Sequence, residues 1–129
     1  MQAQINMIGI ITDQFETMKT FYTDVLGFQV KLEMPNYVEF EQTGVRFAIS
    51  TNAVMHEVTS HKSYTKPATG QRLELAFKED TAAAVDTTYA EIVEKGATPI
   101  TPPADMPWGQ RAAFFADPDG NIHELFTDI

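Results

Sequence analysis

The chain has 129 residues, which suits one domain or two closely packed half-domains and excludes two independent folds. Its formal net charge of -9 argues against nucleic acids and anionic membranes as partners, because both require basic patches. No stretch approaches the roughly 18 apolar residues of a membrane span, no export signal is evident and cysteine is absent, so we expect a soluble, cytoplasmic protein without disulfides or thiolate chemistry.

The first half of the chain predicts a strand, a helix and three further strands. The opening apolar run is rich in isoleucine, which favours a buried strand. Apolar residues then recur at three- and four-residue steps up to Leu26, and Gly27 follows as a helix stop. In chain order we expect a strand at residues 5–12, a helix from 13 or 17 to 26, and strands at 28–33, 37–41 and 45–50.

A polar segment follows, and the pattern then restarts. Residues 51–70 contain Pro67 and Gly70 and show no clear period, so we interpret them as an inter-module linker or an active-site loop. The second half predicts a strand at 72–78, a helix at 81–95, and strands at 97–101, 111–116 and 122–127.

The two halves therefore share one order of elements, which suggests an internal duplication. In each half a glycine closes the helix and another precedes the last strand. Aligning Gly44 with Gly120 sets Ala48 opposite Glu124. We expect an α+β chain of two βαβββ modules, the first at about 4–52, a linker at about 53–70, and the second at about 71–129.

Three segments resemble the vicinal oxygen chelate superfamily, which includes glyoxalases, bleomycin resistance proteins and dioxygenases. They are Phe-Tyr-Thr-Asp-Val-Leu-Gly-Phe at 21–28, Trp-Gly-Gln-Arg at 108–111, and Asp-Pro-Asp-Gly-Asn at 117–121 followed by Glu124. The resemblance implies a single domain over residues 1–129, with curved, open-barrel mixed sheets, helices outside and the ligand on the concave inner face. It also implies a homodimer. Read locally, residues 117–120 form a turn, and Asp117 and Asp119 are not expected to be a catalytic pair.

Metal-using members of this superfamily carry four ligands on the first and last strands of the modules. Glu124 matches one ligand position. Carried over, the other three fall on Met7 or Asn6, on Ala48, and on Arg72 or Gln71. Alanine offers no donor, methionine is soft, and arginine is permanently charged. We therefore expect no cofactor, with one divalent metal as the alternative.

The three histidines do not repair the ligand set. His56 and His61 lie in the polar segment at a spacing without special metal geometry. His123 adjoins Glu124, and neighbouring strand residues point to opposite faces. We therefore expect His123 to face away from Glu124, toward a helix or an edge.

Strand alternation predicts the lining of the inner face. Arginines and glutamates lie there among small and apolar residues, and we expect Arg72 to pair with Glu124 or Glu74. Such a pair could be purely structural, or the guanidinium could bind a carboxylate or another planar anion. Trp108 could close over a ligand or pack at a subunit interface. The candidate site is Glu124 as the catalytic residue, with Arg46, Ser50, Arg72, Glu74, Trp108 and Phe126 as ligand-binding residues.

Two functions remain open from these residues. One is a small-molecule-binding protein similar to bleomycin resistance proteins, which uses no catalytic metal. The other is a lyase, isomerase or dioxygenase of the glyoxalase kind that relies on Glu124, with or without a metal. A lone carboxylate does not decide between them, because general base catalysis also requires substrate geometry and a suitable pKa.

Overall fold

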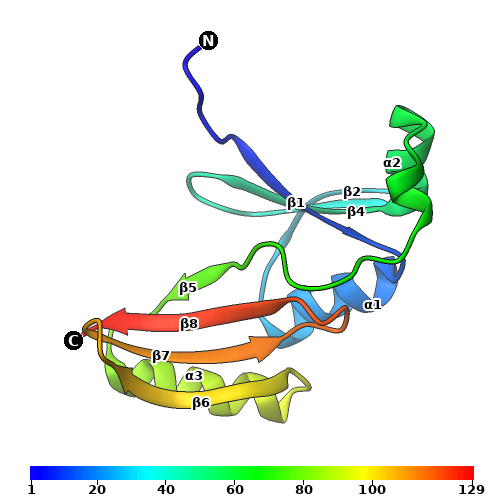
Figure 1. Cartoon of the computed structure of the whole chain (residues 1–129). Helices are drawn as coiled ribbons and strands as arrows, with labels where there is room; N and C mark the ends of the chain where they lie inside the picture. Colours follow the sequence, from blue (N-terminus) through cyan, green and yellow to red (C-terminus); the bar gives the residue numbers. More distant parts are fainter. The chain divides into compact units, whose positions relative to one another are not determined.

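The computed structural model describes all residues, 1–129, and divides into two compact units, residues 1–69 and 70–129. Each unit contains a four-stranded mixed sheet with helices (Figure 1). The strand orders are β1-β4-β3-β2 and β5-β8-β7-β6, and in each sheet the first strand runs parallel to the last. Neither sheet closes into a barrel. The predicted α+β fold of two similar modules is thus confirmed. None of the helices has the length and apolar composition that a membrane-spanning helix requires.

The first unit follows the predicted order of elements. It contains β1 (Met7–Thr12), α1 (Phe15–Thr20), the π-helical segment η1 (Phe21–Val25), β2 (Val30–Met34), β3 (Tyr37–Phe40) and β4 (Arg46–Thr51). One face of the sheet packs an aromatic cluster that Tyr22 of η1 joins to Phe28, Phe40 and Phe47. The other face, which we call the open face of the first unit, carries Met7, Gly9, Arg46, Ala48 and Glu39 by register.

The second unit repeats this arrangement. It contains β5 (Ala76–Lys78), α3 (Ala82–Glu94), β6 (Thr98–Met106), β7 (Gln110–Ala116) and β8 (Ile122–Asp128). Helix α3 covers one face of the sheet (Figure 1), against β6, β7 and β8. Phe115, His123 and Leu125 are buried on that covered face. The opposite side, the open face of the second unit, carries Glu124 and Phe126.

Four elements, α2, η2, β5 and β6, differ from the sequence prediction. The segment expected to be a loop contains α2 (Asn52–Thr59), which begins where the Thr51 hydroxyl accepts the Val54 amide, and the short 3-10 helix η2 (Lys62–Thr65). The helix has only eight residues and none of them is buried, so too few apolar positions marked it in the sequence. Strand β6 runs to Met106 although it contains Pro99, Pro102 and Pro103. It is an edge strand with register shifts, where missing amide donors are tolerated.

Strand β5 begins at Ala76, later than predicted, because side chains replace its expected backbone pairing. The Gln71 side-chain amide both donates to the Ile122 carbonyl (2.9 Å) and accepts from the Ile122 amide (3.0 Å). The Leu75 amide donates to Nδ1 of His123 at 3.1 Å. These contacts hold the segment before β5 against β8, and the carbonyl of Leu75 then accepts the Glu124 amide.

Candidate functional site

Glu124 lies in the middle of the open face of the second unit. In the sheet register it stands between Ala76 of β5 and Phe114 of β7, and Phe126 follows two residues later on the same face. The neighbours His123 and Leu125 are buried on the face that α3 covers. The predicted orientation of Glu124, Phe126 and His123 is therefore confirmed. The carboxylate stands among alanine and phenylalanine side chains.

Glu74 is the second acidic residue of this face. It precedes Ala76 by two residues, and its charge acts on Glu124. The pKa of Glu124 is raised above its ordinary value, first by burial and then by the negative charge of Glu74. Neither carboxylate takes part in a salt bridge, and no cation contributes to the pKa of Glu124. The site thus holds two carboxylates whose charge the chain does not neutralise.

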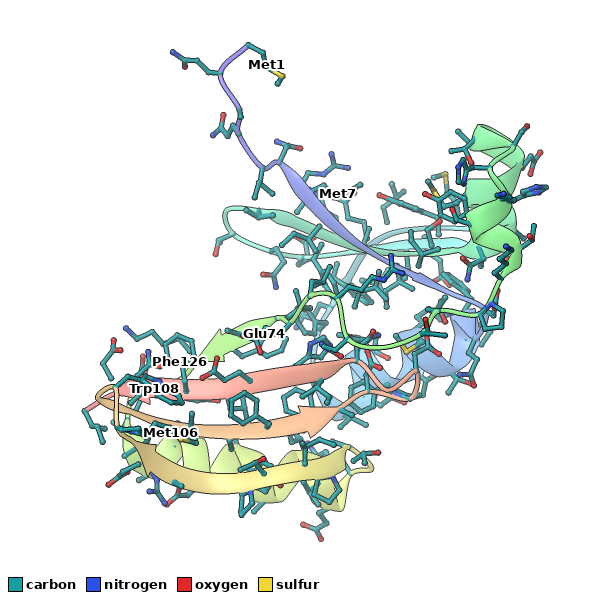
Figure 2. All side chains as sticks on the ribbon, in the orientation of Figure 1. Met1, Met7, Glu74, Met106, Trp108 and Phe126 are labelled. Atoms are coloured by element: carbon teal, nitrogen blue, oxygen red, sulfur yellow. The ribbon has the colours of Figure 1, made fainter.

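Trp108 lies beyond Phe126, in the turn between β6 and β7, and 62% of its surface is exposed. Its indole Nε1 donates to Oε1 of Gln110 at 2.9 Å, and Nε2 of Gln110 donates to Oδ1 of Asp128 at 3.1 Å. The ammonium of Lys78 forms a salt bridge with the same carboxylate, 2.7 Å from Oδ2 of Asp128. This ion pair lowers the pKa of Asp128, with a further contribution from Gln110. Figure 2 shows Glu74, Phe126 and Trp108 along this unit.

Arg72 does not form the expected ion pair. Its side chain is exposed, and it makes no salt bridge with Glu124 or Glu74. The prediction placed Arg72 in a regular strand, but the Gln71 amide and the His123 imidazole replace the backbone ladder there. The register also changes one equivalence between the modules. Since Gly9 pairs with Ala48 and Ala76 pairs with Glu124, the counterpart of Met7 is Glu74 rather than Arg72 or Gln71.

The open face of the first unit contains an arginine–glutamate pair that the sequence analysis missed. Glu39 is only 3% exposed. Arg46 binds its carboxylate through two hydrogen bonds, Nε to Oε2 at 3.1 Å and Nη2 to Oε1 at 2.6 Å. The Tyr37 hydroxyl donates to Oε1 at 2.9 Å. The guanidinium, followed by the hydroxyl, lowers the pKa of Glu39 to about 2.

The alternation of Glu39 with the apolar Val38 and Phe40 was the available signal for its orientation. The sequence did not show that Arg46, seven residues away, would reach it. Ser50, another predicted ligand-binding residue, is buried in β4 beside Tyr37 in the register. In the first unit, therefore, the guanidinium of Arg46 binds Glu39, and its Nη1 also donates to Oδ1 of Asn6 at 3.3 Å.

The histidines and the predicted turn have structural contacts. His56 and His61 are exposed, and His61 contacts Ser63 within its own segment. His123 lies 3.5 Å from Asp117 on the buried side of the second unit. Oδ1 of Asp117 accepts the amides of Asp119 and Asn121, each at 3.0 Å, which is the turn geometry expected of this segment.

The superfamily's four-ligand metal set does not fit these residues. The ligand positions carry Met7, Ala48, Glu74 and Glu124 by register. Only the two glutamates supply hard oxygen donors, alanine supplies none, and thioether sulfur suits soft ions. Gln71 is the other candidate, but the nitrogen and the oxygen of its side-chain amide both form hydrogen bonds with the backbone of Ile122. In neither unit do three histidine, aspartate or glutamate side chains gather in a way that could hold a metal ion.

We therefore expect the purified protein to carry far less than one zinc, nickel, iron or manganese ion per chain. Elemental analysis after dialysis against metal-free buffer would measure this content. A second sample, loaded with excess metal and dialysed in the same way, controls for loss during purification. A content near one ion per chain in either sample would contradict the expectation.

Comparison with known proteins agrees with the two-module fold. The family model described as "Glyoxalase/Bleomycin resistance protein/Dioxygenase superfamily" matches residues 4–125. The uncharacterized protein YwkD of Bacillus subtilis is 33% identical over 127 residues, which cover 95% of this chain and 94% of that protein. A glyoxalase/bleomycin resistance protein/dioxygenase from Nocardioides has a similar structure, with a TM-score of 0.89 and 27% identity, covering 100% of this chain and 85% of that one. A glyoxalase/bleomycin resistance protein/dioxygenase family enzyme from Burkholderia phytofirmans aligns with a TM-score of 0.87 and 22% identity, over 98% of this chain and 100% of that one.

Proposed function

This chain belongs to the glyoxalase/bleomycin resistance protein/dioxygenase superfamily, and on that premise we propose that it binds a small molecule on the open face of the second unit without a catalytic metal. The observation that carries the proposal is the pair Glu74 and Glu124, which has no cationic partner in the chain. Glu74 is exposed to solvent, but Glu124 is half-buried, and a partly buried carboxylate is costly unless something compensates its charge. In the first unit Arg46 compensates Glu39, whereas in the second unit this role is left to a ligand.

The surroundings of Glu124 support binding of an organic molecule. Ala76 and Phe114 flank it in the register, and Phe126 lies on the same face. Apolar walls with few polar groups are the usual composition of small-molecule sites, where the polar groups fix the orientation of the ligand. The homodimer and the cytoplasmic location rest on the resemblance and on composition, and they stay predictions.

Catalysis by Glu124 is the second candidate, and the raised pKa of its carboxyl favours it. A general base works best when its pKa lies near the working pH, and burial beside a like charge moves a carboxyl in that direction. In this version Glu124 takes a proton from the bound molecule. Glu124→Gln then abolishes turnover while binding persists, whereas a pure binding protein shows no turnover before or after the change.

The test of the binding site uses a substitution that fills the open face. Ala76 is exposed and pairs with Glu124, so the phenyl ring in Ala76→Phe should occupy the space beside the carboxylate. We expect any ligand found by a thermal-shift screen to bind Ala76→Phe at least about tenfold more weakly, which corresponds to about 1.4 kcal/mol. The affinity would be measured by calorimetry.

Ala83→Phe provides the matched control, because Ala83 is an exposed alanine on α3, which covers the other face of the sheet. It should leave the affinity unchanged. Equal affinity of both variants and the unmodified protein would place the ligand elsewhere and refute the proposal.

A further inference from the structure

We propose that His123 is a proton-controlled latch: its neutral ring holds residues 71–75 against β8, and a second proton on the ring releases them. We call residues 71–75 the strap, because they precede β5 and are held along β8 largely by side-chain contacts. His123 is buried on the side of the sheet that α3 covers, 1% exposed. The latch would operate whether or not the open face binds the proposed ligand.

The hydrogen bond from the strap fixes the position of the proton on the neutral ring. The Leu75 amide donates to Nδ1 of His123 at 3.1 Å. A backbone N–H can only donate, so Nδ1 carries no proton and the hydrogen of the neutral imidazole is on Nε2. Nε2 lies 3.5 Å from Oδ2 of Asp117. The imidazole therefore connects the strap to the turn between β7 and β8.

Asp117 offers a fixed negative charge to a protonated ring. The residue is 2% exposed. Oδ1 accepts the amides of Asp119 and Asn121, and Oδ2 accepts the side-chain amide of Asn121 at 2.8 Å. N–H donors of this kind stabilise a carboxylate and hold it in place. A second proton on His123 would therefore form a buried ion pair with Asp117 and not an isolated buried charge.

The same proton removes the contact with the strap. Once Nδ1 is protonated, two N–H donors face each other where the Leu75 amide now donates. A buried donor without an acceptor is costly, so the strap has to move until water reaches Nδ1. The other hydrogen bonds of the strap to β8 join Gln71 to Ile122 and the Leu75 carbonyl to the Glu124 amide. Since Glu74 belongs to the strap, a proton on the covered side changes the position of a residue on the open face.

The other neighbours of the ring are mainly apolar. Its centroid lies 5.8 Å from that of Phe115 and 6.1 Å from that of Phe77, both edge-on. The charged residues Lys78, Glu124 and Asp128 of β5 and β8 belong to the open face. The titratable residues of the other adjoining elements are exposed or half-buried, and they are Glu79 after β5, Arg111 of β7, and Asp86, Tyr89, Glu91 and Glu94 of α3. Burial among aromatic rings favours the neutral imidazole, whereas Asp117 favours the charged one.

Nuclear magnetic resonance of the full chain tests the latch in one titration from about pH 8 to about pH 5, the range in which histidine side chains commonly change charge. Nitrogen–proton correlation spectra of the imidazole report where its proton lies and when the second one is added. The same samples give the hydrogen-exchange protection of the Leu75 amide, corrected for the intrinsic effect of pH on exchange.

We expect the Nε2–H form at neutral pH. As the ring becomes charged, the protection of the Leu75 amide should fall at least about fivefold, the effect of losing one hydrogen bond. The Glu79 amide is the internal control, because it donates to the Phe126 carbonyl at 2.8 Å between the same two strands and does not contact the ring. Its protection should stay constant.

Two variants identify the responsible group. In His123→Asn the side-chain oxygen can still accept from the Leu75 amide but cannot be protonated in this range, so the protection should no longer depend on pH. The chain has three histidines, and His56→Gln/His61→Gln removes the two exposed ones and should preserve the response. If His123→Asn fails to fold, the unmodified protein still decides, because ring charge and Leu75 protection are read from one sample.

Several results would overturn the latch. They are a proton on Nδ1 at neutral pH, a ring that stays neutral until the second unit unfolds, unchanged Leu75 protection when the ring is charged, an equal loss at Glu79, or a pH response that persists in His123→Asn. The last result would assign the response to a carboxylate. None of them affects the proposed binding site, which Ala76→Phe tests separately.

Discussion

Replacing Phe40 by alanine is expected to lower the free energy of unfolding by about 3 to 5 kcal/mol, the usual cost of deleting a buried phenylalanine side chain. Phe40 is 1% exposed. Its ring centroid lies 5.5 Å from those of Phe28 and Phe47 and 6.2 Å from that of Tyr22. The truncation leaves a cavity between rings that come from η1, the loop after it, β3 and β4, so the surroundings cannot easily collapse into it.

Urea unfolding followed by circular dichroism would measure this loss. Leu32→Ala is the control, because Leu32 lies on the neighbouring strand β2 with 47% of its surface exposed. We expect its change to stay within about 0.5 kcal/mol, as is common for exposed positions. Similar losses in the two variants would show that the aromatic cluster is not the core of the first unit.

Strand parity was the most reliable information in the sequence. The alternation of Ile122, His123 and Glu124 correctly predicted which side chain turns toward the helix, because one face of each sheet is buried and a one-residue slip would expose the core. The helix at Ala82–Glu94 was equally predictable, because it packs on the sheet and its apolar residues recur over 13 residues. These features depend on burial, which leaves a periodic pattern in the sequence.

The elements that were missed depend on contacts between distant side chains. The shortened β5 results from Gln71 and His123, which lie far apart in the chain and meet only after β8 is in place. The compensation of Glu39 by Arg46 likewise requires the register of β3 against β4. The prediction ended this strand at residue 101, whereas β6 runs to Met106 as an edge strand whose register shifts accommodate its prolines. Periodicity carries no information about such pairs.

The pKa of the carboxyl on the open face is shifted in opposite directions in the two units. In the first unit Arg46 holds Glu39 ionised, whereas in the second unit burial and Glu74 favour the protonated form of Glu124. This contrast supports a structural role for Glu39, which can be tested by removing the compensating cation, whereas a ligand-directed role for Glu124 stays a proposal.

Arg46→Met should raise the pKa of Glu39 well above about 2, because the guanidinium is the largest cause of its depression and burial opposes ionisation. Lys31→Met is the matched control, since the Lys31 ammonium lies farther away, 4.0 Å from Oε2, and its removal should shift the pKa less. Carbon NMR of the Glu39 carboxyl during an acid titration measures both. An unchanged pKa in Arg46→Met would contradict the proposed role of the pair.

The same variant should change how stability depends on pH. A carboxyl whose pKa is lower in the folded state contributes stability above its unfolded pKa and loses that contribution as the pH falls through the folded value. For Glu39 this window extends from its ordinary value of 4.5 down to about 2. As the pH falls across that range, the free energy of unfolding should decrease more steeply in the unmodified protein than in Arg46→Met. The two curves of unfolding free energy against pH should therefore converge toward the acidic end. Parallel curves in urea titrations at several pH values would show that Arg46 does not set the ionisation of Glu39.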